Sequence, residues 1–304
     1  MRIEKGADPL CQLVRFETVD GVGLAGLLFE PARRDDRAVI FLHGTGGSSV
    51  FESKRTNPLA NVLVRNRIAY FPFNNRGAQV IRRAGRDLGG FSYERIRDCV
   101  LDVDAAVAGL RRRGYRDITL AGHSTGANKI AVYDARKTRN LVKRYVMLGG
   151  GDDTGMLYQQ LGARRFANAL ARARVMIRKR RGNELVPASI SQLPMSWRAF
   201  YDMANPDGDY NVFPFMEVIR GIRLSRRPRF RHVRGIRKPA LVLYGDRDEY
   251  AYGGDVSRCV EVLADAIGAK PNFELGIMKD ADHGFSGREE ELGQMIADWI
   301  ELVS

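Results

Sequence analysis

Short apolar runs alternate with helical segments along most of this chain. Six runs of four to six residues have the composition of strands that are buried on both faces. They span residues 38–42, 68–73, 118–121, 145–148, 240–244 and 273–278. Strands that are separated by helices pair in parallel, because a tight hairpin cannot join them. The pattern therefore predicts an α/β protein with a mostly parallel sheet and helices on both of its faces.

Helices and two further strands complete this prediction. Apolar residues at three- and four-residue spacing predict helices over 57–65, 93–113, 125–138 and 256–267. A final helix carries one apolar face, made of Leu292, Met295, Ile296, Trp299 and Val303. Apolar stretches at 10–18 and 23–29 flank a turn at 20–22 and predict an antiparallel pair at one edge. The predicted sheet thus has eight strands.

One segment differs from the rest in composition. Residues 151–238 hold 18 Lys and Arg but only 7 Asp and Glu, so they carry most of the net charge of +13. They also interrupt the alternation of strands and helices. We therefore expect a core built from residues 1–150 and 239–304, with 151–238 as a basic, mainly helical lid or cap insertion.

Two features of this insertion each have two interpretations. The basic stretch 172–181 is interleaved with apolar residues and predicts a helix. That helix either turns a solvated face outward or contacts an anionic membrane surface or anionic substrates. An aromatic group either lines an apolar substrate pocket or forms the core of the insertion: Trp197, Phe200, Tyr201, Tyr210, Phe213 and Phe215.

The motif G-x-S-x-G at residues 122–126 is the strongest chemical signal. It follows a short apolar strand and precedes a helix. A sharp strand-to-helix turn of this kind exposes a strained serine, and the helix N-terminus behind it favours developing negative charge. Ser124 is therefore the candidate nucleophile.

A serine needs a base, and the chain has four histidines. His43 and His123 lie in glycine-rich turns, and His232 lies in Arg-rich sequence, where we expect a surface residue. His283 directly follows the last predicted strand. It is the candidate general base.

The base in turn needs a carboxylate that fixes its tautomer. Asp248 follows the strand before that of His283, which gives the chain order Ser, Asp, His. We select Asp248 over Asp246, which we expect to cap the turn. Asp152 and Asp153, after the strand at 145–148, are further alternatives.

Backbone N–H groups are expected to bind the oxyanion. One donor is Thr125, directly after the nucleophile. The other is Thr45, in the glycine-rich loop after the strand at 38–42. Side chains or backbone that we expect at the same edge of the sheet, and therefore near substrate, are those of His43, Gly44, Gly46, His123 and Arg76.

Taken together, these motifs resemble the α/β-hydrolase superfamily, in particular its lidded serine esterases and lipases. The matching segments are His43-Gly44, 75–77, 122–126, 245–248 and Asp282-His283. The resemblance implies the α/β-hydrolase fold and covers the core. A similarity to uncharacterised hydrolases grouped with fungal siderophore esterases is a further lead. Many relatives read D-x-R-G-x-G-x-S where this chain has residues 74–80, so Arg76 has either a substrate-binding or a purely structural role.

Other chemistries find no support. Residues 21–26 fit G-x-G-x-x-G but open a strand, and residues 44–49 lack the lysine of a phosphate-binding loop. Cys11, Cys99 and Cys259 are unclustered, which argues against zinc. No apolar stretch approaches the ~20 residues of a membrane span. We expect a cytoplasmic protein that needs no metal and no organic cofactor.

The resulting hypothesis is a carboxylesterase-like serine hydrolase that forms an acyl-enzyme on Ser124, with a small ester, anionic in one version of the hypothesis, as its substrate. Thioesterase, peptidase and C–C hydrolase chemistry remain open, because the fold does not fix the substrate. The alternative from another class is a hydrolase-fold binding protein for a ligand, an anionic surface or nucleic acid. Nucleic acid is disfavoured because no recognition motif is present, and the sequence leaves the oligomeric state open.

Overall fold

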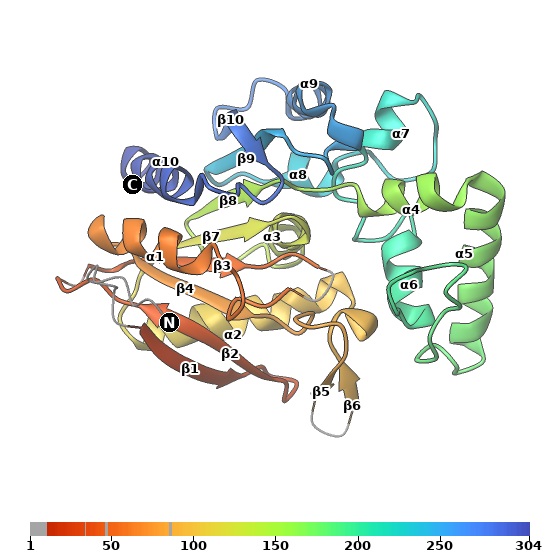
Figure 1. The fold of residues 1–304 in the computed structure, drawn as a ribbon, viewed down its shortest axis with the longest axis horizontal. Coiled ribbons are helices and arrows are strands. Elements are labelled where there is room, and N and C mark those ends of the chain that lie inside the picture. The colour runs from red at the N-terminus through yellow and green to blue at the C-terminus, as the bar shows by residue number, and fades with distance from the viewer. Residues whose placement is uncertain (1–10, 34, 46–47, 85–86) are drawn as a thin grey trace.

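An eight-stranded sheet forms the centre of the molecule (Figure 1). The computed structural model describes residues 11–33, 35–45, 48–84 and 87–304. In spatial order the strands are β1 (Cys11–Glu17), β2 (Gly23–Phe29), β4 (Ala69–Asn74), β3 (Arg37–Leu42), β7 (Asp117–His123), β8 (Arg144–Leu148), β9 (Ala240–Arg247) and β10 (Phe273–Asp282). β2 runs antiparallel to both of its neighbours, β1 and β4, and all other neighbouring strands of this sheet pair in parallel. The predicted α/β fold with a mostly parallel sheet is confirmed.

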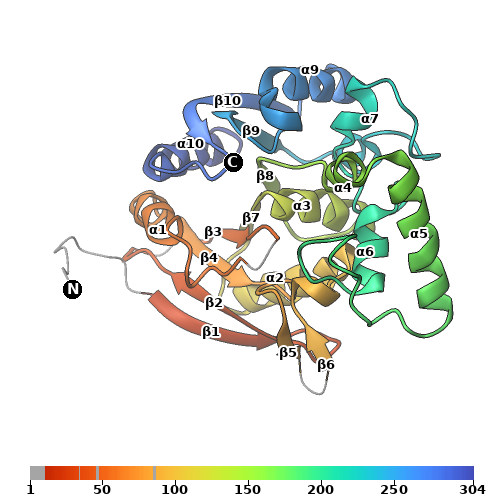
Figure 2. The same ribbon diagram turned by 45° about the vertical axis from the view of Figure 1, so that its right-hand side comes forward.

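Helices cover both faces of this sheet, as predicted (Figures 1 and 2). On one face, α1 (Thr56–Arg65) packs against α10 (Glu289–Leu302). The other face carries α2 (Cys99–Arg112), α3 (Thr125–Arg136) and α9 (Val256–Ile267). Alternate residues of the central strands supply the two apolar layers: Ile40 and Leu42 face α2 and α3, whereas Val39 and Phe41 face α1 and α10. The strand ends are thus fixed from both sides.

Five helices lie between β8 and β9. They are α4 (Asp153–Leu161), α5 (Ala163–Arg178), α6 (Trp197–Ala204), α7 (Phe215–Ile219) and α8 (Arg231–Gly235). The first three pack on one another at the end of the sheet toward which the parallel strands point (Figure 1). Their apolar residues belong to the same buried cluster as the face of the sheet that carries α2 and α3. This segment is therefore continuous with the core.

The helix predicted over 93–113 is shorter than expected. Residues Phe91–Tyr93 and Ile96–Asp98 form separate 3₁₀ turns, and the α-helix α2 begins only at Cys99. The backbone N–H of Ile96 donates to Asp202 Oδ2 at 2.7 Å, so a contact with α6 takes a donor that a helix would use. A small hairpin, β5 (Arg82–Ala84) and β6 (Asp87–Gly89), precedes these turns.

Candidate active site

Ser124 occupies a sharp turn between β7 and α3. Its backbone has φ 57° and ψ −128°, a conformation that is strained for any residue except glycine. The flanking glycines are needed because backbone passes very close to them. A Cβ at Gly122 would lie 2.5 Å from the carbonyl oxygen of Gly126, and one at Gly126 would lie 2.3 Å from that of Leu42. The structure thus contains the strand–turn–helix that the motif predicts.

His283 contacts one carboxylate of the candidates, that of Asp248. Its Nδ1 lies 2.9 Å from Asp248 Oδ1. The same oxygen accepts the backbone N–H of Tyr250 at 3.0 Å and of Ala251 at 3.2 Å. Asp248 is only 1% exposed, and its Oδ2 has no hydrogen-bond partner among the described residues. The loop after β9 therefore holds a fixed, negatively charged partner for the imidazole at the end of β10.

Gly149 brings the serine turn and this His–Asp pair together. The backbone N–H of Ser124 donates to the carbonyl of Leu148 at 2.8 Å, and Gly149 follows with φ 55°. A Cβ at Gly149 would lie 3.2 Å from both Asp248 Oδ2 and His283 Nδ1. The sequence analysis did not identify this residue. The three consecutive glycines at 149–151, directly after a predicted strand, were the available signal.

The loop after β3 reaches the nucleophile from the other side. A Cβ at Gly44 would lie 2.9 Å from Ser124 Cβ, so the backbone of this loop touches the serine. Thr45 follows directly, whereas Gly46 lies outside the described residues. Thr125 is the first residue of α3, where a backbone N–H has no acceptor within the helix. The two predicted oxyanion donors thus belong to segments that flank Ser124.

His43 and His123 are buried and neutral. Burial lowers the pKa of His43 to about 3 and that of His123 well below its ordinary value. His43 Nδ1 donates to the carbonyl of Gly44 at 2.7 Å. His123 Nε2 donates to the carbonyl of His283 at 2.6 Å. Both rings therefore hold backbone of the site, and their contact with substrate stays a prediction.

The alternative carboxylates have other partners. Asp246 Oδ1 accepts the backbone N–H of Ala281 at 3.1 Å. Asp152 caps α4 through the N–H of Gly155 at 2.7 Å. Asp153 accepts hydrogen bonds from Asn128 Nδ2 at 3.1 Å and Thr125 Oγ1 at 3.4 Å, and burial raises its pKa to about 6. Asp153 thus lies beside the first turn of α3 without a hydrogen bond to His283.

Arg76 and Lys129 each form ion pairs with acidic residues near α3. Arg76 is ion-paired with Asp102 at 2.8 Å and with Asp20 at 3.0 Å. Lys129, on α3, is fully buried and lies 2.6 Å from Glu94 Oε1. These partners occupy the charge of Arg76, so a contact between Arg76 and substrate stays a prediction.

His232 differs from its prediction. It is only 5% exposed, and its Nε2 lies 3.3 Å from Asp209 Oδ1. The expectation of a surface residue is wrong, because the Arg-rich segment folds back against α3 and exposes its arginines while it buries this ring. The aromatic group of the insertion is largely core: five of its members are 2% exposed or less, namely Trp197, Phe200, Tyr210, Phe213 and Phe215.

The basic stretch forms the last two turns of α5 and the loop that follows. Arg172, Arg174 and Arg178 are exposed, whereas Leu170 and Ala173 are buried. Within the part of the chain that the structure describes, no helix is long and apolar enough to cross a membrane.

Comparisons with known proteins address the fold directly. Est1E from Butyrivibrio proteoclasticus, solved with ferulic acid bound, superposes with a TM-score of 0.62 at 17% identity over 95% of this chain and 99% of that one. The Pyrococcus furiosus esterase Pf2001 gives 0.59 at 19% identity, over 100% and 96%. The carboxylesterase CesB from Bacillus subtilis gives 0.55 at 14%, over 97% and 91%. At these identities the likeness concerns the fold.

A family assignment comes from the sequence itself. No curated protein matches this chain. Residues 39–293, however, match the profile of the alpha/beta hydrolase family. That match spans both β3, which precedes the Gly44 loop, and the His283 turn after β10. This chain therefore belongs to the alpha/beta hydrolase family.

Proposed function

We propose that this protein is a serine hydrolase that cleaves carboxylic esters through an acyl-enzyme on Ser124. The observation that carries the proposal is the 2.9 Å contact between His283 Nδ1 and Asp248 Oδ1, next to a serine at φ 57°. The esterases among the structural neighbours support the choice of an ester over other acyl compounds.

The chemistry begins at Ser124. Its hydroxyl oxygen attacks the ester carbonyl while His283 Nε2 accepts the proton. Asp248 holds Nδ1 protonated and stabilises the imidazolium that forms. His283 then donates the proton to the leaving alcohol, and later removes one from the water that releases the acid.

The oxyanion is bound by the backbone N–H groups of Thr45 and Thr125. One such donor contributes about 3–4 kcal/mol to transition-state stabilisation in comparable hydrolases. The N-terminus of α3 adds a favourable partial positive charge. His43 and His123 are neutral, and each ring hydrogen-bonds a backbone carbonyl of the site. This fits a role in holding the backbone around the oxyanion.

The insertion at 151–238 acts as a lid over this site. Phe213 supports this role, because a Cβ at Gly150 would lie 2.4 Å from its ring. Asp152 Oδ2 also accepts the backbone N–H of Met216 at 2.8 Å, which fixes the start of α7 near the end of β8. These contacts attach the insertion directly after β8, at the edge of the sheet that carries Ser124. We infer that its side chains limit which substrates reach Ser124.

The test compares Ser124→Ala with Ser257→Ala, an exposed serine on α9. We expect Ser124→Ala to lower kcat for 4-nitrophenyl acetate by a factor on the order of 10⁴ or more. It should also abolish labelling by a fluorophosphonate probe, while Ser257→Ala keeps both. Wild-type turnover in Ser124→Ala would refute the mechanism.

A further inference from the structure

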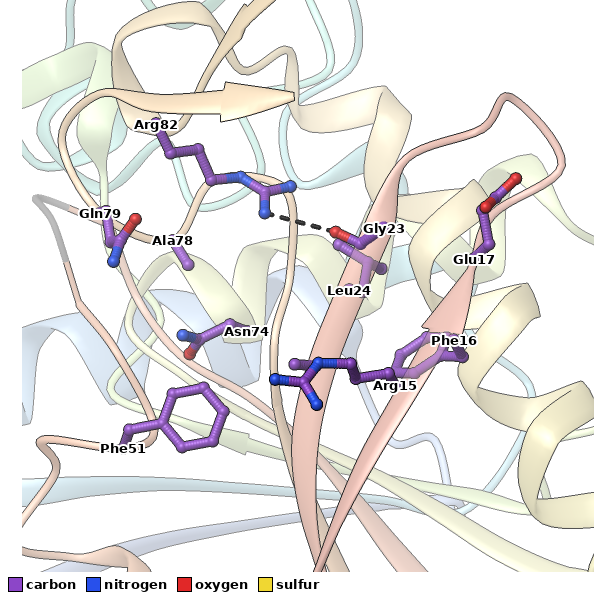
Figure 3. A pocket seen from close by; sticks show the side chains of 11 residues that line it. Arg15, Phe16, Glu17, Gly23, Leu24, Phe51, Asn74, Ala78, Gln79 and Arg82 are labelled. Atoms are coloured by element: carbon purple, nitrogen blue, oxygen red, sulfur yellow. Dashed lines mark hydrogen bonds between the residues drawn. The ribbon is translucent and has the colours of Figure 1, made fainter. Parts of the chain in front are cut away.

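A cavity of about 640 Å³ lies between the β1–β2 hairpin and the loops that follow β3 and β4 (Figure 3). Its apolar walls are Phe16, Leu24, Phe51 and Ala78. Phe51 is 47% exposed, so an aromatic ring stands at its open side. These walls suit the hydrocarbon part of a small molecule.

Arg82 is a charged group of this cavity with buried nitrogens and a single long hydrogen bond. Its Nη1 donates to the carbonyl of Gly23 at 3.4 Å (Figure 3). Its Nε and Nη2 are buried without a hydrogen-bond partner among the described residues, and no carboxylate of these residues lies within ion-pair distance. Asp102 and Glu94 attract the guanidinium only from beyond ion-pair distance. Buried N–H donors that lack an acceptor are costly, so Arg82 has two donors available for an anion.

The other polar side chains around Arg82 favour an anion as well. Arg15 projects into the same space, and Gln79, held at φ 63°, lines it from the loop after β4 (Figure 3). Glu17 is the one acidic residue among those that line the cavity, and its carboxylate points away from both arginines (Figure 3). The local charge is thus positive.

Residues of this cavity are hydrogen-bonded to the segment 48–50, which follows β3 and the Gly44 loop. Asn74 Oδ1 accepts the backbone N–H of Val50 at 2.8 Å, and its Nδ2 donates to Ser49 Oγ at 3.0 Å. The N–H of Gln79 donates to the carbonyl of Ser48 at 3.3 Å. These bonds fasten the cavity to the loop whose Gly44 touches Ser124. A ligand in the cavity is therefore held by the same loop that carries the oxyanion donor.

Arg76, six residues before Arg82, differs from it because its guanidinium has carboxylate partners. Its guanidinium is paired with two aspartates, Asp102 and Asp20. We propose that the cavity is a subsite for a carboxylate carried by the ester substrate, with Arg82 as its main partner and Phe51 against the hydrocarbon chain. Arginine suits this task because its fork matches a carboxylate. The inference rests on the proposed ester hydrolysis.

The experiment uses two esters of nearly equal shape. Mono-4-nitrophenyl glutarate carries a carboxylate where 4-nitrophenyl pentanoate carries a methyl group. We expect the wild type to show a higher kcat/KM for the glutarate ester. Arg82→Gln should lower the ratio of the two kcat/KM values by about 10- to 100-fold, the usual size of a charged hydrogen-bond loss. The ratio for Arg82→Lys should fall between those of the wild type and Arg82→Gln, because lysine keeps the charge but lacks the planar fork of the guanidinium.

Arg83→Gln is the matched control. Arg83 is exposed and does not line the cavity, so the ratio should stay at the wild-type value. An unchanged ratio in Arg82→Gln, with ester turnover intact, would overturn the subsite and leave the proposed function standing.

Failure of the proposed function would look different. Neither ester would be hydrolysed and the fluorophosphonate probe would not label Ser124. The subsite is then judged by calorimetric binding of glutarate itself. Binding that Arg82→Gln weakens at least about tenfold would support an anion site, and equal or absent binding in both proteins would refute it.

Discussion

Two histidine–aspartate contacts occur within the described residues, and they differ in their surroundings. His283 lies 2.9 Å from Asp248, and His232 lies 3.3 Å from Asp209. Asp248 is otherwise held by backbone N–H groups, whereas Asp209 accepts both charged hydrogen bonds of Arg136, at 2.6 and 2.7 Å. The first pair adjoins the strained serine. In the second pair, His232 on α8 meets Asp209 in the loop after α6, and Asp209 also binds Arg136 on α3.

The difference shows that the neighbours of a carboxylate decide what a histidine contact can do. Burial by itself would raise the pKa of Asp209, but hydrogen bonds from His232 and Arg136 outweigh it and hold that pKa below its ordinary value. Its charge is already compensated by a guanidinium. Asp248 has no such cation within ion-pair distance among the described residues, so its charge remains available to stabilise an imidazolium.

The largest expected effect separates the two aspartates by activity. Asp248→Asn should lower kcat for 4-nitrophenyl esters by about 10³- to 10⁴-fold, because the amide favours the wrong tautomer of His283. Asp209→Asn should leave kcat unchanged. Steady-state kinetics of both variants tests this. Equal losses in the two would show that the surroundings do not distinguish the pairs.

A second prediction concerns Gly149, which lies beside the His283–Asp248 pair. Gly149→Ala places a methyl group against Asp248 and His283, so we expect kcat to fall by about 10- to 100-fold, as for comparable misplacements. Gly221→Ala is the matched control, since Gly221 has φ 63° and a Cβ added there would have nothing within 4 Å. Both should lose about 1 kcal/mol of stability. A normal kcat in Gly149→Ala would argue against close packing around His283.

The sequence predicts the first pair well and the second not at all, for a physical reason. Ser124, Asp248 and His283 each directly follow a strand of the parallel part of the sheet, and parallel strands bring their carboxyl ends to one edge. The sequence predicts that the strand before His283 is buried on both faces, but β10 is an edge strand with few buried residues. The proximity of Ser124, Asp248 and His283 still follows from the order of the elements. Catalytic roles for these residues remain predictions that the kinetics above address.

His232 and Asp209 follow no strand. Their meeting depends on how a segment of irregular loops and short helices folds back on α3. The same holds for Ile96, whose backbone N–H is taken by Asp202 across 106 positions of sequence, and which a helical pattern therefore misplaces. Local periodicity cannot report such long-range donors, so the insertion and its borders are where the sequence misleads.

A third prediction concerns the contribution of the His232–Asp209 pair to the stability of the fold. Asp209→Asn removes the charge that Arg136 and His232 share, and we expect a loss of about 1–3 kcal/mol in the free energy of unfolding. The pKa of Asp209 is lowered in the folded state, so its contribution is present above about pH 4, the ordinary Asp pKa, and is lost as the pH falls below it. Urea unfolding at pH 7 and pH 3 measures this. The difference between variant and wild type should shrink at pH 3, and a constant difference would contradict the assignment.

The smallest effect concerns His232 itself. His232→Asn leaves Asp209 paired with Arg136, so the carboxylate keeps its counter-charge and the loss should be about 0.5–1.5 kcal/mol, that of an ordinary hydrogen bond. For the His283–Asp248 pair we expect the histidine to matter more than the aspartate, because in the proposed mechanism His283 carries the proton and its loss should abolish turnover. Thermal unfolding and ester kinetics of His232→Asn and His283→Asn give the comparison. If His232→Asn cost as much activity as His283→Asn, the His232 ring on α8 would have to reach substrate, which does not fit its burial against Asp209.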